Sequence, residues 1–188
     1  MAILPLTKSC ISNADTSTGI QRWLFGRIGP EAWQDWYVCC RRAVNNQKKS
    51  DGEILVVCDV WQPGWIEPEA AVQERAVKQL DGHYVLIKEG HDTLSQMLVA
   101  IAWARENNCD LQVIASPSHY LRVAVHLQIW RWRGETKGVE IDQIVGWGLP
   151  RPLEALTDLL LNLITPTIDV IGQRSWWISR LRQQRRTI

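Results

Sequence analysis

The sequence predicts an α/β protein in which helices cover both faces of a mainly parallel, doubly wound sheet. Two observations carry this prediction. Short apolar segments alternate with longer amphipathic segments along the chain, which is the pattern of βαβ units. The short segments are also apolar at consecutive positions, as strands are when helices pack on both faces of their sheet.

The first fifty residues are the least regular part of this pattern. Residues 1–19 are polar and rich in Ser and Thr, so we expect an irregular N-terminal segment there. Residues 21–29, "QRWLFGRIG", could be a first strand that ends in a glycine turn. A helix is expected over 30–47, because Pro30 suits the first turn of a helix and the acidic Glu31 follows it.

From residue 53 the alternation is clear. The run "EILVVCDVW" (53–61) is apolar and of strand length, and the turn residues "SDG" precede it. A helix over 67–80 carries an apolar stripe at helical spacing. A strand at 83–89 and a helix at 93–108 repeat the unit.

The second half of the chain repeats it again. A strand is expected at 111–116 and a helix at 119–133, followed by a weaker strand and loop at 138–148. Residues 152–165 predict a closing helix. Because parallel strands joined by helices have right-handed crossovers, these segments fit one sheet of at least four strands.

The charge of the chain is unevenly distributed. Its formal net charge is +1, yet residues 174–188 carry five Arg and no acidic residue, which leaves residues 1–173 at −4. We therefore expect a single domain over 1–173 without a nucleic-acid-binding surface, and a basic Trp- and Arg-rich tail over 174–188. The tail could contact an acidic partner or a membrane surface, or it could be a solvated, partly frayed helix.

The five cysteines are odd in number and lack the spacing of metal sites, which favours a reducing compartment. The N-terminus has no basic, apolar leader, and no apolar run reaches the ~20 residues of a spanning helix. We expect a cytoplasmic protein without a transmembrane segment or a metal site. The sequence identifies neither a cofactor nor an oligomeric state.

The stretch "SPSHYLR", at the end of the strand expected at 111–116, is rich in polar side chains. Ser116 with Pro117 at the first helical position is a favourable helix start, and Ser118 is the other candidate cap. Either start points backbone N–H groups at the strand end, where they attract an anion. His119 and Arg122 are three residues apart and share a helix face, and a guanidinium suits phosphate or carboxylate. Alternatively, these residues only begin a helix and pair at the surface.

A second polar group, "EGHDTLSQ", follows the preceding strand. Thr93 and Gln96 have the spacing of a capping box, which alone could account for both residues. Glu89 and Asp92 are candidates for a general base or for the carboxylate that orients His119. The catalytic candidates are therefore His119, Glu89 and Asp92. Alternatively, the residues of this loop only form a turn and cap the helix.

A third group follows the strand at 53–61. Asp59 ends that strand in "CDVWQPGW", where two Trp side chains could form the wall of a pocket. Glu69 lies near the start of the next helix, where a carboxylate stabilises the helix dipole or could bind a ligand. The candidate ligand-binding residues are therefore Asp59, Glu69, Thr93, Gln96, Ser116, Ser118 and Arg122.

Three stretches resemble the YdcF-like domain family, which includes the SanA and ElyC envelope proteins. That family has a helix opened by Ser/Glu-x-Glu, a strand ending in Glu before a polar loop with Asn-Thr or Asp-Thr, and a strand ending in "TSPxHxxRA". The matching stretches are "IEPEAAVQERAV" (66–77), "VLIKEGHDTLSQ" (85–96) and "VIASPSHYLRVA" (113–124). The last is the most specific, and the resemblance covers about residues 53–133.

The resemblance implies a Rossmann-like three-layer fold. Members of the family are associated with envelope metabolism, and one has been linked to S-adenosylmethionine. The chain departs from the family where glycine-rich loops become "FGRIGP" and "CDVWQPGW", and Gln96 stands where the family usually has Asn. The chain therefore resembles a divergent or inactive relative of the family. The pocket that the resemblance implies contains Glu69, Glu89, Thr93, Ser116, His119 and Arg122.

Three functions fit these observations. The chain could be an enzyme, a hydrolase or transferase, that acts on a phosphorylated or nucleotide-linked small molecule, with His119 as the acid/base and Arg122 on the anion. It could be a non-catalytic binding or regulatory module that keeps the pocket but has lost the glycine loops. It could also be a scaffold whose Trp residues and basic tail contact a protein or a membrane surface, which an exposed apolar patch would favour.

Overall fold

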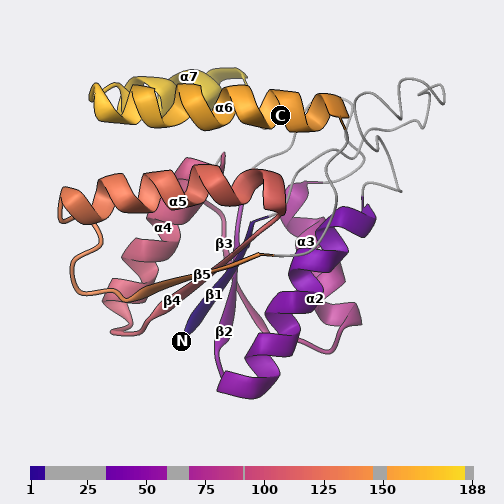
Figure 1. Cartoon of the computed structure of the whole chain (residues 1–188). Coiled ribbons are helices and arrows are strands. Elements are labelled where there is room, and N and C mark those ends of the chain that lie inside the picture. The colour runs from indigo at the N-terminus through magenta and orange to yellow at the C-terminus, as the bar shows by residue number, and fades with distance from the viewer. Residues whose placement is uncertain (7–32, 59–67, 91, 146–151, 185–188) are drawn as a thin grey trace.

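The computed structural model of the protein describes residues 1–6, 33–58, 68–90, 92–145 and 152–184, and the structural statements below concern these residues. Five parallel strands form one sheet in the order β3-β2-β1-β4-β5 (Figure 1). The predicted α/β class, with a Rossmann-like parallel sheet between helices, is confirmed. The strands are β1 (Ala2–Leu6), β2 (Glu53–Val57), β3 (Tyr84–Ile87), β4 (Leu111–Ala115) and β5 (Ile141–Val145).

Two pairs of helices cover the two faces of the sheet (Figure 1). The helices α2 (Trp33–Ser50) and α3 (Glu69–Gln79) pack on one face. The helices α4 (Thr93–Glu106) and α5 (Pro117–Trp132) pack on the other. The predicted alternation of strand and helix from residue 53 to the end of α5 is therefore the observed one.

Two further helices form an additional layer outside α5 (Figure 1). The closing helix α6 is longer than predicted, since it runs over Pro152–Val170 with Pro166 inside it. The basic tail begins as helix α7 (Arg174–Gln184). Within the described residues, no helix has both the length and the apolarity that crossing a bilayer requires.

The strands are apolar on both faces because each face packs against helices. Ile3, Ile54 and Ile114 point to one side, where they join an apolar cluster with residues of α2 and α3. Successive side chains of a strand point to opposite faces. Their neighbours therefore point toward α4 and α5, in a second cluster that includes Leu4, Leu55 and Val113.

The central strand lies where the sequence predicts irregular structure. The expectation for residues 1–19 is wrong for residues 2–6, which form β1 with all five side chains buried. β1 pairs with β4 over its whole length, but with β2 only at Ala2 and Ile3. Pro5, which cannot donate a ladder hydrogen bond, thus lies where β1 has one paired neighbour. The strand expected at 21–29 lies outside the described residues.

The strand order creates a switch point between β1 and β4. The chain passes outward from β1 to β2 and β3 with its helices on one face, then returns to β4 and β5 with helices on the other. Ligands of open parallel sheets bind at such a point, beyond the carboxyl ends of the strands. We call this side of the sheet, where Leu6 and Ala115 end their strands, the carboxyl edge.

Candidate functional site

The helix α5 begins at the carboxyl edge as the sequence predicts. Ser116 is the N-cap, with extended backbone angles (φ −62°, ψ 156°), and Pro117 is at the start of the helix. The alternative cap, Ser118, is therefore excluded as the N-cap, and its side chain lies outside the described residues. The first backbone N–H groups of α5 consequently lie next to the end of β4 at the switch point.

His119 and Arg122 lie in the first two turns of α5 and are buried, with 5% and 6% of their surface exposed. Both belong to the helix face that packs inward, as their spacing predicts. Arg and His side chains are rarely buried in a protein unless their polar atoms have hydrogen-bond or charged partners. This part of α5 therefore combines a buried cation, a buried imidazole and a helix N-terminus at the switch point.

The helix α4 also begins at the carboxyl edge, but its cap differs from the predicted one. The capping box is formed by Asp92 and Ser95, not by Thr93 and Gln96. The Ser95 N–H donates to Asp92 Oδ1 at 2.7 Å, and the Asp92 N–H donates to Ser95 Oγ at 3.1 Å. The backbone of Asp92 is extended (φ −156°), so Asp92 is the N-cap and Thr93 is the first helical residue. Gln96 therefore takes no part in the cap, and its side chain is buried.

The loop after β3 lies closely against this first turn of α4. Gly90 has a φ of +86°, and a Cβ at this residue would come within 3.0–3.3 Å of Gln96 atoms. Only glycine adopts this backbone without strain and leaves that space. The glycine in "EGHDT" thus folds the loop onto α4 and holds Gln96 in place.

The catalytic candidates are brought together only in part. α4 and α5 pack against each other on one face of the sheet, and the charges of Asp92 and Arg122 both influence the pKa of His126. Glu89, in contrast, is exposed to solvent beside β3, the outermost strand. Three strand spacings separate β3 from β4, roughly 14 Å, and this distance keeps Glu89 away from His119.

Glu69 is at the carboxyl edge on the opposite face of the sheet. It is the first residue of α3 and is 4% exposed, with the buried Gln73 one turn further along the helix. A buried carboxylate there is stabilised by the N-terminus of its own helix. The remaining candidate, Asp59, lies outside the described residues, as does His91.

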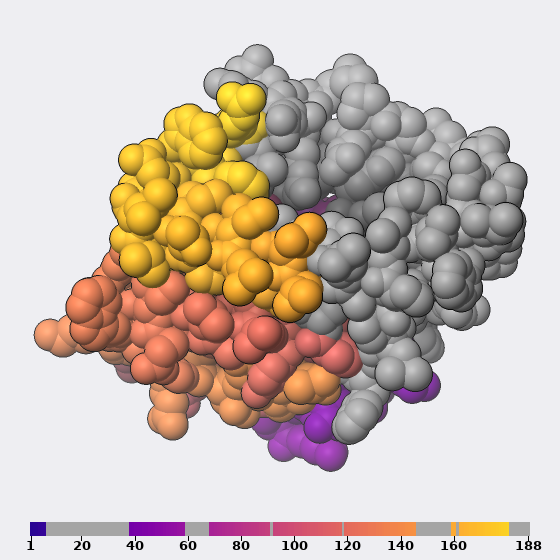
Figure 2. Space-filling model, turned by 45° about the horizontal axis from the view of Figure 1, so that its top comes forward, coloured from indigo at the N-terminus to yellow at the C-terminus, as the bar shows by residue number. Residues whose placement is uncertain are grey.

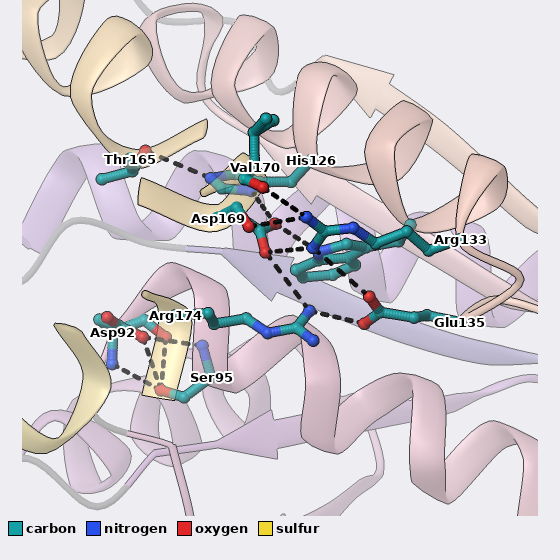
Figure 3. Close-up of polar contacts among 10 residues, drawn as sticks. Asp92, Ser95, His126, Arg133, Glu135, Thr165, Asp169, Val170 and Arg174 are labelled. Carbon is teal, nitrogen blue, oxygen red and sulfur yellow. Dashed lines mark hydrogen bonds and ion pairs between the residues drawn. The ribbon is translucent and has the colours of Figure 1, made fainter. Parts of the chain in front are cut away.

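The sequence did not predict a second polar cluster, which joins α5, α6 and α7 around Asp169 (Figure 3). Asp169 is completely buried on α6. Its carboxylate accepts hydrogen bonds from Trp130 Nε1 at 2.6 Å, His126 Nδ1 at 3.1 Å and Arg133 Nη1 at 3.0 Å. Arg174 of α7 completes the ion pairs at 3.6 Å. We call these residues, with Thr165, the Asp169 cluster.

The surroundings of His126 in this cluster favour its neutral form. Burial lowers the pKa of His126 below its ordinary range, and the charge of Arg122 lowers it further, although the hydrogen bond and the charge of Asp169 act in the opposite direction. Because a carboxylate only accepts, Nδ1 carries the proton, and Nε2 accepts from the Thr165 hydroxyl at 3.2 Å.

The order Thr–His–Asp in this cluster resembles that of a hydrolase triad, but its surroundings differ. The Thr165 side chain is only 8% exposed, and the carboxylate is shared with Trp130 and two arginines. A nucleophile must reach a substrate, and its carboxylate partner must act mainly on the histidine. The cluster therefore fixes the positions of three helices.

The start of the tail belongs to this cluster. Arg174 Nη1 donates to Glu135 Oε2 at 2.6 Å, and its guanidinium lies 5.7 Å from the centre of the Trp130 ring. Ile178, one turn further along α7, packs against the apolar core. The predicted solvated tail is thus anchored over its first turns.

Within the part of the chain that the structure describes, no group of three or more His, Cys, Asp or Glu side chains could hold a metal ion. The donors at the carboxyl edge, a guanidinium and helix N–H groups, are of the kind that binds an anion.

Comparison of the chain with family models, with curated proteins and with solved structures finds no match.

Proposed function

We propose that this chain is a divergent YdcF-like domain protein that binds a phosphorylated or nucleotide-linked small molecule at the carboxyl edge. The observation that carries the proposal is the burial of His119 and Arg122 in the first two turns of α5, next to the switch point. Arg donates in a planar fork that fits phosphate oxygens, and the helix N-terminus favours negative charge. The sequence motif "SPSHYLR" supports the same assignment.

A second candidate function is catalysis on the same ligand, as a hydrolase or transferase with His119 as the general acid/base. The buried imidazole favours it, because a histidine close to a bound anion is placed to transfer protons. We put binding first because Asp92 is engaged in the cap of α4 and Glu89 is exposed. The cysteine pattern supports a reducing compartment, such as the cytoplasm, for either function.

A thermal-shift screen with inorganic phosphate, adenine nucleotides, sugar phosphates and S-adenosylmethionine tests the proposal. A ligand at about 100 times its Kd should stabilise the fold by roughly 2.7 kcal/mol. Arg122→Ala should then weaken binding by about 1.5–3 kcal/mol, the range for hydrogen bonds to a charged group. Arg41→Ala, on the opposite face of the sheet, is the matched control because Arg41 is exposed on α2.

Because Arg122 is buried, its removal also lowers stability, so affinity is measured by calorimetry below the melting transition of the variant. Unchanged affinity in Arg122→Ala would rule out the proposed site. His119→Ala distinguishes the two functions. A loss of turnover of about 10²–10⁴-fold with little change in affinity indicates an acid/base, whereas a loss of affinity alone indicates a binding module.

A further inference from the structure

The helix α6 and the residue after it present a row of apolar side chains to solvent, which the exposed Thr167 interrupts. At 100° per residue, the side chains of this stripe cover about 140° of the helix circumference. Their exposed fractions lie between 45% and 63%. Monomeric proteins rarely expose contiguous apolar surface of this kind unless something binds it. We call these residues the α6 stripe: Leu159, Leu160, Leu163, Ile164, Val170 and Ile171.

Among the described side chains of α6, which are 159–160 and 162–170, some polar residues are buried and several apolar residues are exposed. Its inward side carries Thr165 and Asp169, which are both buried, whereas its outward side carries the stripe. A surface helix normally buries its apolar face. Here the carboxylate of Asp169 is held by His126, Trp130 and Arg133 on α5, so the helix cannot turn its stripe inward without breaking those bonds.

The neighbouring helix α7 supplies positive charge and an exposed aromatic ring. Trp176 is 52% exposed, and the guanidinium of Arg180 lies 5.9 Å from the centre of its ring. The tail 174–188 carries five Arg and no acidic residue. Figure 2 shows α6 and α7 side by side on the face that is turned toward the viewer. An apolar strip beside basic and aromatic residues complements an anionic, partly apolar surface.

We propose that this face binds an anionic lipid surface. The α6 stripe would lie in the plane of the membrane at the boundary of headgroups and acyl chains, with Trp176 at headgroup level and the arginines of the tail on lipid phosphates. A second copy of the chain fits less well as the occupant, because its own five-Arg tail would meet the same kind of charge across the interface. This contact is independent of the ligand site at the carboxyl edge.

Vesicle co-sedimentation of the full chain tests the proposal, with phosphatidylcholine vesicles compared with vesicles that also contain phosphatidylglycerol. The wild type should bind the anionic vesicles, and added salt should weaken this binding. Leu160→Gln/Leu163→Gln/Ile164→Gln should weaken it by roughly tenfold or more, because the apolar area is lost while Gln preserves helix propensity. Arg180→Gln should weaken it about fivefold. Leu121→Gln is the matched control, since Leu121 is 53% exposed on α5, outside the stripe.

Wild-type binding that is absent, or equal on neutral vesicles, would overturn the proposal. So would a triple variant that melts like the wild type and still binds normally. Sedimentation velocity tests whether a second copy of the chain binds the stripe instead. A dimeric wild type and a monomeric triple variant, with no vesicle binding by the wild type, would assign the stripe to a second copy. Should the triple variant not fold, Arg180→Gln alone decides, because Arg180 is exposed and its removal leaves the core unchanged.

Discussion

The two ends of α5 each carry a buried histidine and an arginine, but in different settings. The first end has His119 and Arg122, at the carboxyl edge of the sheet. The other has His126, Trp130 and Arg133, which bind Asp169 (Figure 3). A buried carboxylate accounts for the donors at the second end, so that end joins helices. The two ends thus place similar side chains in different parts of the fold, one at the switch point of the sheet and one between helices.

The two ends are also linked electrostatically. Arg122 lies one turn from His126 and lowers its pKa, whereas Asp92, at the start of α4, raises it. The lowered pKa of His126 therefore depends in part on a residue of the candidate ligand site. Substitutions in the Asp169 cluster, and a change of pH, should reveal how far this cluster differs from the carboxyl edge.

The largest effect is expected from Asp169→Ala. The substitution removes the acceptor of three hydrogen bonds and leaves the buried side chains of His126 and Trp130, and the partly exposed guanidinium of Arg133, without the Asp169 carboxylate. Removing one partner of a buried ion pair costs about 3–5 kcal/mol. Urea denaturation should show this loss in the free energy of unfolding, whereas Asp142→Ala, at an exposed position of β5, should change it by less than about 0.5 kcal/mol. A loss below about 1 kcal/mol for Asp169→Ala would mean that the cluster does not join the helices.

Acidification should have the next largest effect, through His126. Because burial holds the folded pKa below the ordinary value of about 6.5, the unfolded chain takes up the proton first. The stabilising contribution is complete above about pH 6.5 and falls as the pH drops from there toward the folded pKa, by at most about 1.4 kcal/mol per pH unit.

Urea denaturation at a series of pH values measures this slope. His126→Asn keeps a donor toward Asp169 but cannot titrate. Between pH 7 and 5, the free energy of unfolding of this variant should therefore change less per pH unit than that of the wild type, by at most about 1.4 kcal/mol. His83→Asn is the matched control, because His83 is exposed and uses only its backbone in hydrogen bonds to Gln47. Equal slopes in His126→Asn and the wild type would show that His126 is not held neutral.

The smallest effect is expected from Arg174→Gln, at the edge of the Asp169 cluster. Arg174 is partly exposed, so its ion pair with Glu135 and its contact with the Trp130 ring should together contribute about 1 kcal/mol. Thermal melting should detect this change. Arg180→Gln, which removes an exposed arginine of the same helix, should leave the melting temperature close to that of the wild type. Identical melting temperatures of the two variants would indicate that the tail is solvated, which is one of the alternatives that the sequence leaves open.

Much of the fold could be predicted because its determinants are local. The apolar runs of β2 and β4, and the helices that follow them, have boundaries within a few residues of the expected ones. Residues 2–6 could not be predicted in this way, since a five-residue strand with Pro5 carries no alternation and is stabilised by neighbours distant in the chain. Ser116 was one of two predicted caps for α5, and the structure selects it, whereas the cap of α4 was placed one residue too late, because a capping spacing occurs at both registers.

The sequence by itself determined the class of the fold, the start of α5 and the charge of the tail, because periodicity, capping residues and charge are properties of short segments. Only the tertiary structure decided which polar residues meet. The partners of Asp169 on α5 lie between 36 and 43 positions away, and no local pattern specifies such contacts. It also decided that the α6 stripe faces outward. An amphipathic helix by itself is expected to bury its apolar side, whereas the hydrogen bonds from His126, Trp130 and Arg133 keep the Asp169 side of α6 inward.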